Sequence, residues 1–185
     1  MNAADPSKDP AVGLPTGTIR NVVPADTDAL VALAVATGLF LPGEADLLLR
    51  QTLDDMHEGR LGAGHFACAL YGATGGAPEG WVYFSLNPKA DGIWDLWWIG
   101  VDPARQGTGV GSRLLSYVEA HVQEQGGRVL IIETSSQPPL AATRAFYRRR
   151  GYRECGCVPD FYAPGDGKIT FAKTVSPHSP PAMGL

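Results

Sequence analysis

A glycine-rich loop in the middle of the chain has the residue types that bind an anion through the backbone. The loop runs from Gln106 to Gly111, with glycine at every second position: Gly107, Gly109 and Gly111. Glycines leave backbone N–H groups unshielded, and a helix that starts at the loop adds a positive dipole end. The spacing is neither a P-loop nor the dinucleotide pattern G-x-G-x-x-G. We expect the loop to hold a phosphate, with Arg105 adding a cation; the alternative is a glycine turn that only lets a helix pack against a strand.

A strand and a helix must position this loop. Residues Ile93 to Val101 are rich in β-branched and aromatic side chains and stop at Asp102-Pro103, which predicts a strand. After the loop, apolar residues recur every four positions, at Val110, Leu114, Val118 and Val122. This spacing predicts an amphipathic helix, and Gly126 and Gly127 provide its stop.

The strand, the loop and the helix together resemble the acetyl-CoA-binding core of the GNAT superfamily of N-acetyltransferases. Gln106, Gly109 and Gly111 fill the defining positions of the pattern Gln/Arg-x-x-Gly-x-Gly/Ala. Further along, residues 145–152 are similar to the family's Phe-Tyr-x-x-x-Gly-Phe/Tyr segment. The resemblance covers the chain from about residue 80 to about residue 175.

The patterns along the chain agree with the fold that this resemblance implies. That fold is α/β, with a mixed, mostly antiparallel sheet, a central parallel strand pair and the order βααβββαβαββ. The residues themselves predict one helix from about Glu44 to Glu58 and a loop from Asp160 to Gly167. We expect a single domain over residues 17–175, with flexible tails at residues 1–16 and 176–185.

The resemblance implies that the cofactor is acetyl-CoA and that two segments hold it. Strand residues Ile99 to Val101 would offer backbone to the cofactor where two parallel strands splay apart. Tyr147 matches the tyrosine that the family places near the CoA sulfur as general acid, although a tyrosine packing a helix end is the alternative. The residues expected to bind the cofactor are Ile99, Gly100, Val101, Arg105, Gln106, Gly107, Thr108, Gly109, Val110, Gly111, Ser112, Phe146 and Tyr147.

Carboxylates in two strands are candidates for the general base. Glu133 ends an apolar run, where we expect its side chain to point into the cleft, and it would act directly or through water. Asp95 lies within an aromatic strand and would instead be the base or bind the acceptor amine. The residues expected to contact the acceptor are Asp95, Trp97, Asp160 and Tyr162. One departure from the family is Leu140, which stands where many members have an asparagine that contacts the cofactor.

Composition excludes several classes of function. The 185-residue chain has a formal net charge of −4, without the basic face that a nucleic-acid binder needs. Its three cysteines include no CxxC pair and its histidines show no metal-ligand spacing, so we expect neither a disulfide framework nor a metal site. The sequence shows no signal peptide and no apolar run long enough to span a bilayer. We therefore expect a cytoplasmic protein.

We interpret the chain as an N-acetyltransferase that moves an acetyl group from acetyl-CoA to a primary amine by direct attack. The acceptor would be a small molecule or an amino-acid-like compound. The alternatives are a noncatalytic acyl-CoA-binding sensor and a protein lysine or N-terminal acetyltransferase. A homodimer is compatible with the resemblance, because many family members dimerise through their sheets.

Overall fold

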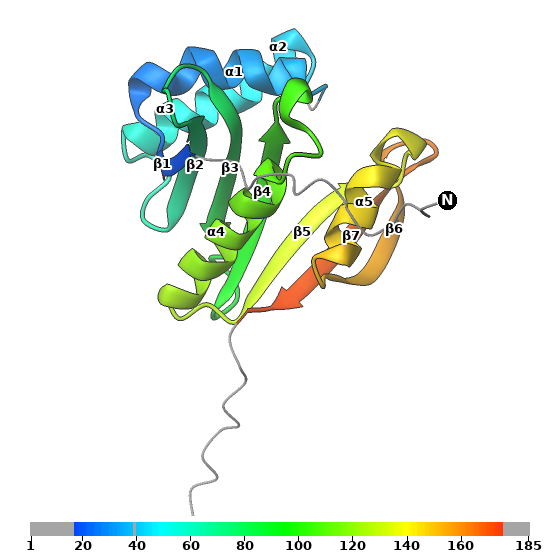
Figure 1. Cartoon of the computed structure of the whole chain (residues 1–185). Coiled ribbons are helices and arrows are strands. Elements are labelled where there is room, and N and C mark those ends of the chain that lie inside the picture. Colours follow the sequence, from blue (N-terminus) through cyan, green and yellow to red (C-terminus); the bar gives the residue numbers. More distant parts are fainter. Residues whose placement is uncertain (1–16, 39, 176–185) are drawn as a thin grey trace, which may run out of the picture.

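The structure, a computed structural model, describes residues 17–38 and 40–175. Within these residues seven strands form one sheet in the order β1-β2-β3-β4-β5-β7-β6 (Figure 1). Only β4 and β5 pair in parallel, and the other neighbours are antiparallel. The strands are β1 Gly17–Asn21, β2 His65–Gly72, β3 Pro78–Leu86, β4 Ile93–Val101, β5 Val129–Ser135, β6 Arg153–Ala163 and β7 Asp166–Thr174. The mixed sheet and the element order confirm the predicted fold; the expected tails, residues 1–16 and 176–185, lie outside the described residues.

Helices cover both faces of the sheet and enclose two apolar cores. Alternate residues of β2 and β3 face opposite ways, so Ala67 and Trp81 pack with the first helices while Cys68 and Val82 pack with the central helix. The first helices are α1 Thr27–Ala36, α2 Pro42–Glu44 and α3 Gln51–His57; the later ones are α4 Val110–Glu124 and α5 Ala141–Arg149. Short 3₁₀ turns are η1 Pro24–Asp26, η3 Pro103–Arg105 and η4 Pro138–Leu140.

The second helical segment differs from the prediction. A single α-helix was expected from Glu44 to Glu58, but its middle is a π-helix, η2 Ala45–Arg50, set between α2 and α3. Arg50 ends this wider turn and donates to Asp46 in the same segment and to Asp28 on α1, at 2.8 and 2.7 Å. Hydrophobic periodicity cannot distinguish such a turn from regular α-helix, and π turns recur near functional sites.

The expected loop from Asp160 to Gly167 is also wrong. Strand β6 continues to Ala163, which pairs with Asp166 at the start of β7, so only a short turn joins the two strands. Asp160 makes this possible with a positive φ of 52°, and its carboxylate accepts a hydrogen bond from the Gly165 N–H at 2.7 Å. The aspartate and glycines that predicted a loop form the irregular end of a hairpin instead.

No helix in the described ranges is both long and apolar enough to cross a membrane.

Candidate active site

The parallel strands β4 and β5 part in the middle of the sheet. They pair from Ile93 opposite Val129 to Leu96 opposite Ile132, and their pairing ends there. Beyond this point β4 stays with β3, and β5 stays with β7. The backbone of β4 past Leu96 therefore has no strand on its β5 side, which is where the family resemblance implied a free edge at residues 99–101.

A β-bulge lies at the same point. Tyr83 of β3 pairs with Trp98 and Phe84 pairs with Leu96, so Trp97 is an extra residue in β4. The bulge shifts the alternation by one position: Leu96 and Ile99 both pack in the core under α4, while Trp98 packs against Phe40 in the other core. Trp94 and Trp98, four residues apart in the strand, therefore lie in different cores.

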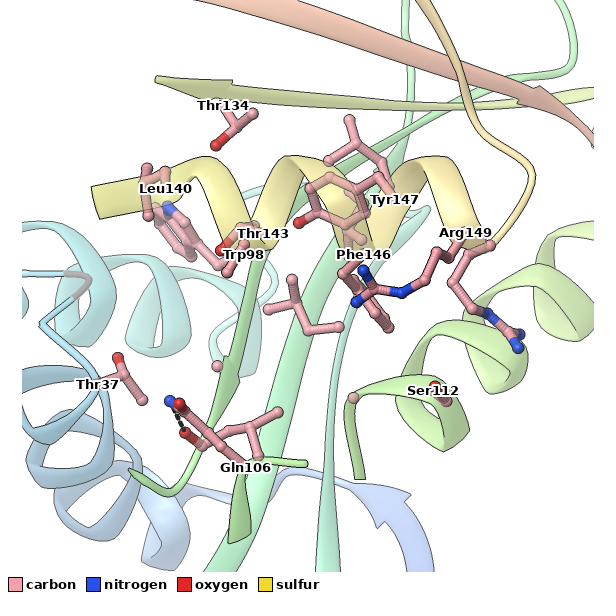
Figure 2. A pocket seen from close by; sticks show the side chains of 18 of the residues that line it. Thr37, Trp98, Gln106, Ser112, Thr134, Leu140, Thr143, Phe146, Tyr147 and Arg149 are labelled. Carbon is pink, nitrogen blue, oxygen red and sulfur yellow. Dashed lines mark hydrogen bonds between the residues drawn. The ribbon is translucent and has the colours of Figure 1, made fainter. Parts of the chain in front are cut away.

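A cavity of about 830 Å³ opens where the strands part. One end is lined by Gly109, Gly111 and Ser112 at the start of α4, and another part of its wall contains Thr37 and Trp97. Figure 2 shows the labelled wall residues, with Phe146 and Tyr147 on α5, Gln106 in the loop and Ser112 on α4 around one space. The cavity thus joins the glycine-rich loop to residues from the end of α1 and from the bulge.

The loop has the backbone geometry of an anion site. Gly109 is the N-cap of α4 with a φ of 94°, and Gly107 has a φ of 76°, values that L side chains rarely adopt. The first N–H groups of α4 have no partner inside the helix, so they are available to an anion. Of the predicted loop residues, Thr108 and Val110 do not line the cavity: the Thr108 hydroxyl donates to the Arg105 carbonyl, and Val110 is buried.

The arginines that line the cavity near this loop are not limited to Arg105, the one expected from the sequence. Arg105 lines the cavity, but its guanidinium pairs with Glu79 at 3.0 Å. Two arginines that the sequence reasoning missed, Arg149 and Arg150, also line the cavity. Among the described residues Arg149 makes no ion pair or hydrogen bond, and Figure 2 shows it on the same side of the pocket as Ser112. The three consecutive arginines at positions 148–150 were the available signal.

Tyr147 lies on the wall of the cavity and is held firmly by other rings. Its side chain is only 3% exposed, and its ring centroid lies 5.5 Å from that of Phe146 and 5.6 Å from that of Phe171. No partner for its hydroxyl is found among the described residues. Burial raises the pKa of Tyr147 far above its usual range, so the hydroxyl keeps its proton at neutral pH.

Glu133 lines the cavity from β5, but it has a partner. Its Oε1 lies 3.0 Å from Lys168 Nζ on β7, and the Thr170 hydroxyl donates to the same oxygen at 3.5 Å. Its neighbours Ile132 and Thr134 are buried, so alternation points Glu133 to the sheet face opposite α4 and α5.

Most of the other residues predicted to contact the acceptor do not line the cavity. Asp95 does not line the cavity and accepts a hydrogen bond from Asn87 Nδ2 at 2.8 Å. Burial raises the Asp95 pKa and the charge of Glu133 raises it further, against the lowering effect of Asn87. Asp160 and Tyr162 also lie outside the cavity wall, so Trp97 is the one predicted acceptor residue that lines it within the described chain.

Leu140 lines the cavity at the start of α5. Arg144 fixes this start, because its Nη1 donates to the carbonyls of Ser135 and Gln137 at 2.8 and 2.9 Å. Figure 2 shows Leu140 on α5 near Thr143, which also lines the cavity, so an apolar side chain occupies the position where an asparagine was expected.

This chain is similar in sequence to known acetyltransferases. A family model described as "Acetyltransferase (GNAT) family" matches residues 36–152. The mycothiol acetyltransferase of Kineococcus radiotolerans is 40% identical over 58% of this chain and 33% of its own length. The blasticidin-S acetyltransferase of Streptomyces morookaense is 35% identical over 54% of this chain and 65% of its own length. The chain thus spans less than two thirds of these relatives.

Solved structures of acetyltransferases match a larger part of the chain than these two relatives do. A GNAT-family structure from Desulfovibrio desulfuricans has a TM-score of 0.78 and 32% identity, covering 87% of this chain and 100% of the other. Structures of the same fold have been solved with coenzyme A or acetyl-CoA. The parted strands, the glycine-rich start of α4 and the matched family model together show that this chain belongs to the GNAT family of acetyltransferases.

Proposed function

We propose that this protein is an acetyl-CoA-dependent N-acetyltransferase that acetylates the primary amine of a small molecule by direct attack. The observation that carries this proposal is the cavity at the parting of β4 and β5, because it connects an anion site with a second region of the wall around Trp97 and Glu133. A donor and an acceptor bound in these two places would meet between the strands.

The residues around the glycine-rich loop fit the phosphate groups of acetyl-CoA. The N–H groups at the start of α4, the open backbone at Gly107 and Gly109, and the guanidinium of Arg149 would hold these phosphates. Beyond Leu96, the unpaired edge of β4 would hold the rest of the cofactor through the backbone. When bound, acetyl-CoA supplies an acetyl group activated as a thioester.

Tyr147 and the β4 edge would handle the charges that develop during transfer. The Tyr147 hydroxyl keeps its proton because burial raises its pKa, so it can give that proton to a departing thiolate. Backbone N–H groups of β4 past Leu96 would stabilise negative charge on the acetyl oxygen.

Glu133 is the proposed base, directly or through a water, because it lines the cavity and Asp95 does not. Its Oε1 lies 3.0 Å from Lys168 Nζ, and its carboxylate would accept a proton from the acceptor ammonium. Asp95 remains the second candidate, since burial raises its pKa and so makes it a stronger base than an ordinary aspartate.

A small-molecule acceptor is supported by the two curated relatives, which are named for mycothiol and blasticidin S. A cytoplasmic site of action is supported by the cysteines, since Cys68, Cys155 and Cys157 are all free thiols.

The test is turnover by the full chain with acetyl-CoA and a panel of small amines and peptides. We expect coenzyme A release together with an acetylated small amine, identified by its mass. Binding of acetyl-CoA in a calorimeter without turnover of any acceptor would show a sensor instead. Turnover of peptides alone would show a protein acetyltransferase.

A further inference from the structure

Three large aromatic side chains are half-exposed: Trp97 on the wall of the cavity, and the neighbouring pair Phe161 and Tyr162 on β6. The exposed fractions are 53% for Trp97, 52% for Phe161 and 49% for Tyr162. The Phe161 and Tyr162 rings contact each other, with centroids 5.0 Å apart. Exposed apolar side chains that contact one another, rather than lie scattered, commonly mark a binding site.

Each of these rings is held in place by a specific contact. Trp97 Nε1 donates to the Oγ of buried Ser85 at 2.9 Å. The Lys168 ammonium lies 4.1 Å from the centroid of the Phe161 ring, and Tyr162 meets Phe161 edge-on, with centroids 5.0 Å apart. Rings that are already fixed lose little conformational entropy when they bind a ligand.

Glu133 connects the rings to the cavity. It lines the cavity together with Trp97, and its ion pair partner Lys168 is the group that covers Phe161. Tyr162 is close enough to Glu133 that the carboxylate raises its pKa, in addition to the larger effect of burial. Lys168 also shows that an ammonium can be bound here between a carboxylate and an aromatic face.

The carboxylates in this region are already engaged, which argues against recognition of a polycation. Glu133 pairs with Lys168, Asp95 accepts from Asn87, and Asp160 accepts from the Gly165 backbone. The half-exposed surfaces of Trp97, Phe161 and Tyr162 are instead apolar and aromatic.

We infer that the acceptor is a primary amine carried on an aromatic or similarly flat apolar group. This inference rests on the proposed function and names the class of its acceptor. The flat group would stack on Trp97 or on the Phe161 and Tyr162 pair, with the amine directed past Glu133 into the cavity. Stacking between rings adds to the effect of apolar area alone.

The experiment compares four amines, 2-phenylethylamine, 2-cyclohexylethylamine, n-butylamine and the polycation spermidine, with each kcat/KM corrected for the fraction of free amine at the assay pH. We expect kcat/KM for the phenyl compound to exceed that for the cyclohexyl compound about 3- to 10-fold, the range expected for one aromatic contact. Spermidine should be the poorest acceptor.

Substitutions of Trp97 and Phe161 test whether their rings cause the preference for the phenyl over the cyclohexyl amine. Trp97→Ala and Phe161→Ala should each reduce the phenyl-to-cyclohexyl ratio several-fold, and Phe161→Leu should do so while keeping apolar bulk. Val23→Ala, at an exposed apolar side chain that does not line the cavity, is the control and should leave the ratio unchanged. Acetyl-CoA affinity, measured by calorimetry, should be the same in all four variants.

Two experimental outcomes distinguish a wrong acceptor class from a wrong proposed function. If butylamine or spermidine is acetylated as well as the phenyl compound, or if the ring variants lower every kcat/KM equally, the aromatic acceptor is wrong while acetyl transfer stands. If no amine or peptide is acetylated although acetyl-CoA binds, the proposed function fails as well.

Discussion

Tyr147 is the side chain on which the proposed chemistry depends most. It is buried among Phe146, Tyr152 and Phe171, and its hydroxyl has no partner among the described residues. The ring is buried, but the hydroxyl is open to the cavity that Tyr147 lines, where a ligand or water can bond to it. This position therefore suits a group whose hydrogen bond forms only when the cavity is filled.

Replacing Tyr147 by phenylalanine removes the proton and keeps the ring. We expect Tyr147→Phe to lower kcat by about 100-fold or more with little change in acetyl-CoA affinity. Tyr152→Phe is the matched control: that buried hydroxyl donates to Glu119 at 3.1 Å and does not line the cavity, so its loss should reduce stability but not kcat. Wild-type kcat in a folded Tyr147→Phe variant, with chemistry limiting the rate, would remove Tyr147 from the mechanism.

Asp26 allows a test of stability against pH. Its carboxylate accepts from two nitrogens of Arg20, at 2.7 and 2.8 Å, and from the Val23 N–H. The hydrogen bonds from Arg20 are the largest cause of its lowered pKa. Because the folded pKa lies below the unfolded one, the stabilisation is fully present above about pH 4 and is lost as pH falls through the folded pKa.

Asp26→Asn should therefore lower the free energy of unfolding by about 1 kcal/mol at pH 7, with the difference shrinking below about pH 4. Urea titrations at several pH values would measure it. Asp28→Asn, at a fully solvated partner of Arg50, is the control and should change little. A difference for Asp26→Asn that stays constant down to pH 2 would contradict this account.

Two predicted catalytic residues lie at the cavity. Tyr147 was expected from the family's motif and Glu133 from its place at the end of an apolar run, and both line the cavity wall. Arg149 was missed because nothing in a run of three arginines shows which one faces inward. Asp95 and Asp160 were placed at the acceptor, but each is engaged by a neighbour and lies outside the cavity wall. Contacts of this kind depend on strand register, which a sequence does not reveal.

At the scale of elements, the glycine-rich loop and the helix after it were predictable because their signals are local. The parting of β4 from β5 was expected from the family resemblance alone. The bulge at Trp97 was not foreseen, because residues 93–101 are apolar at almost every position and a shift in alternation cannot be seen there. The π turn before α3 was not foreseen, because hydrophobic periodicity does not distinguish it from regular α-helix.

Gly109 tests the anion site at the start of α4. At a φ of 94° any L residue is strained, and a side chain would shield the backbone N–H groups. Gly109→Val should raise the dissociation constant of acetyl-CoA about tenfold or more, measured by calorimetry. Gly126→Val is the matched control, since Gly126 has a φ of 73° at the far end of α4 with open space around it. Gly126→Val should reduce stability without changing the affinity for acetyl-CoA. If the wild type, Gly109→Val and Gly126→Val all bind acetyl-CoA equally well, the loop is only the start of a helix.

At the scale of the whole molecule, the sheet separates two regions of the cavity. By strand alternation Glu133 points to the face opposite α4 and α5. The glycine-rich loop leads into α4, which covers the other face of the sheet (Figure 1). No cysteine lines the cavity within the described residues, so a covalent acetyl-thiol intermediate has no residue to form on. The proposed direct attack requires donor and acceptor to be bound together.

Initial rates measured over both substrates should therefore give intersecting double-reciprocal lines, the pattern of a ternary complex. Mass spectrometry of the protein after incubation with acetyl-CoA alone should show no acetylated intermediate that an added amine then discharges. Parallel lines with such an intermediate would mean transfer through the enzyme and would exclude direct attack.

The most direct measurement is a crystal structure of the full chain with coenzyme A bound. The account predicts phosphate density against the N–H groups at the start of α4, and a sulfur inside the cavity within hydrogen-bonding reach of the Tyr147 hydroxyl. Coenzyme A bound elsewhere on the molecule, or a sulfur that lies outside the parting of β4 and β5, would contradict it.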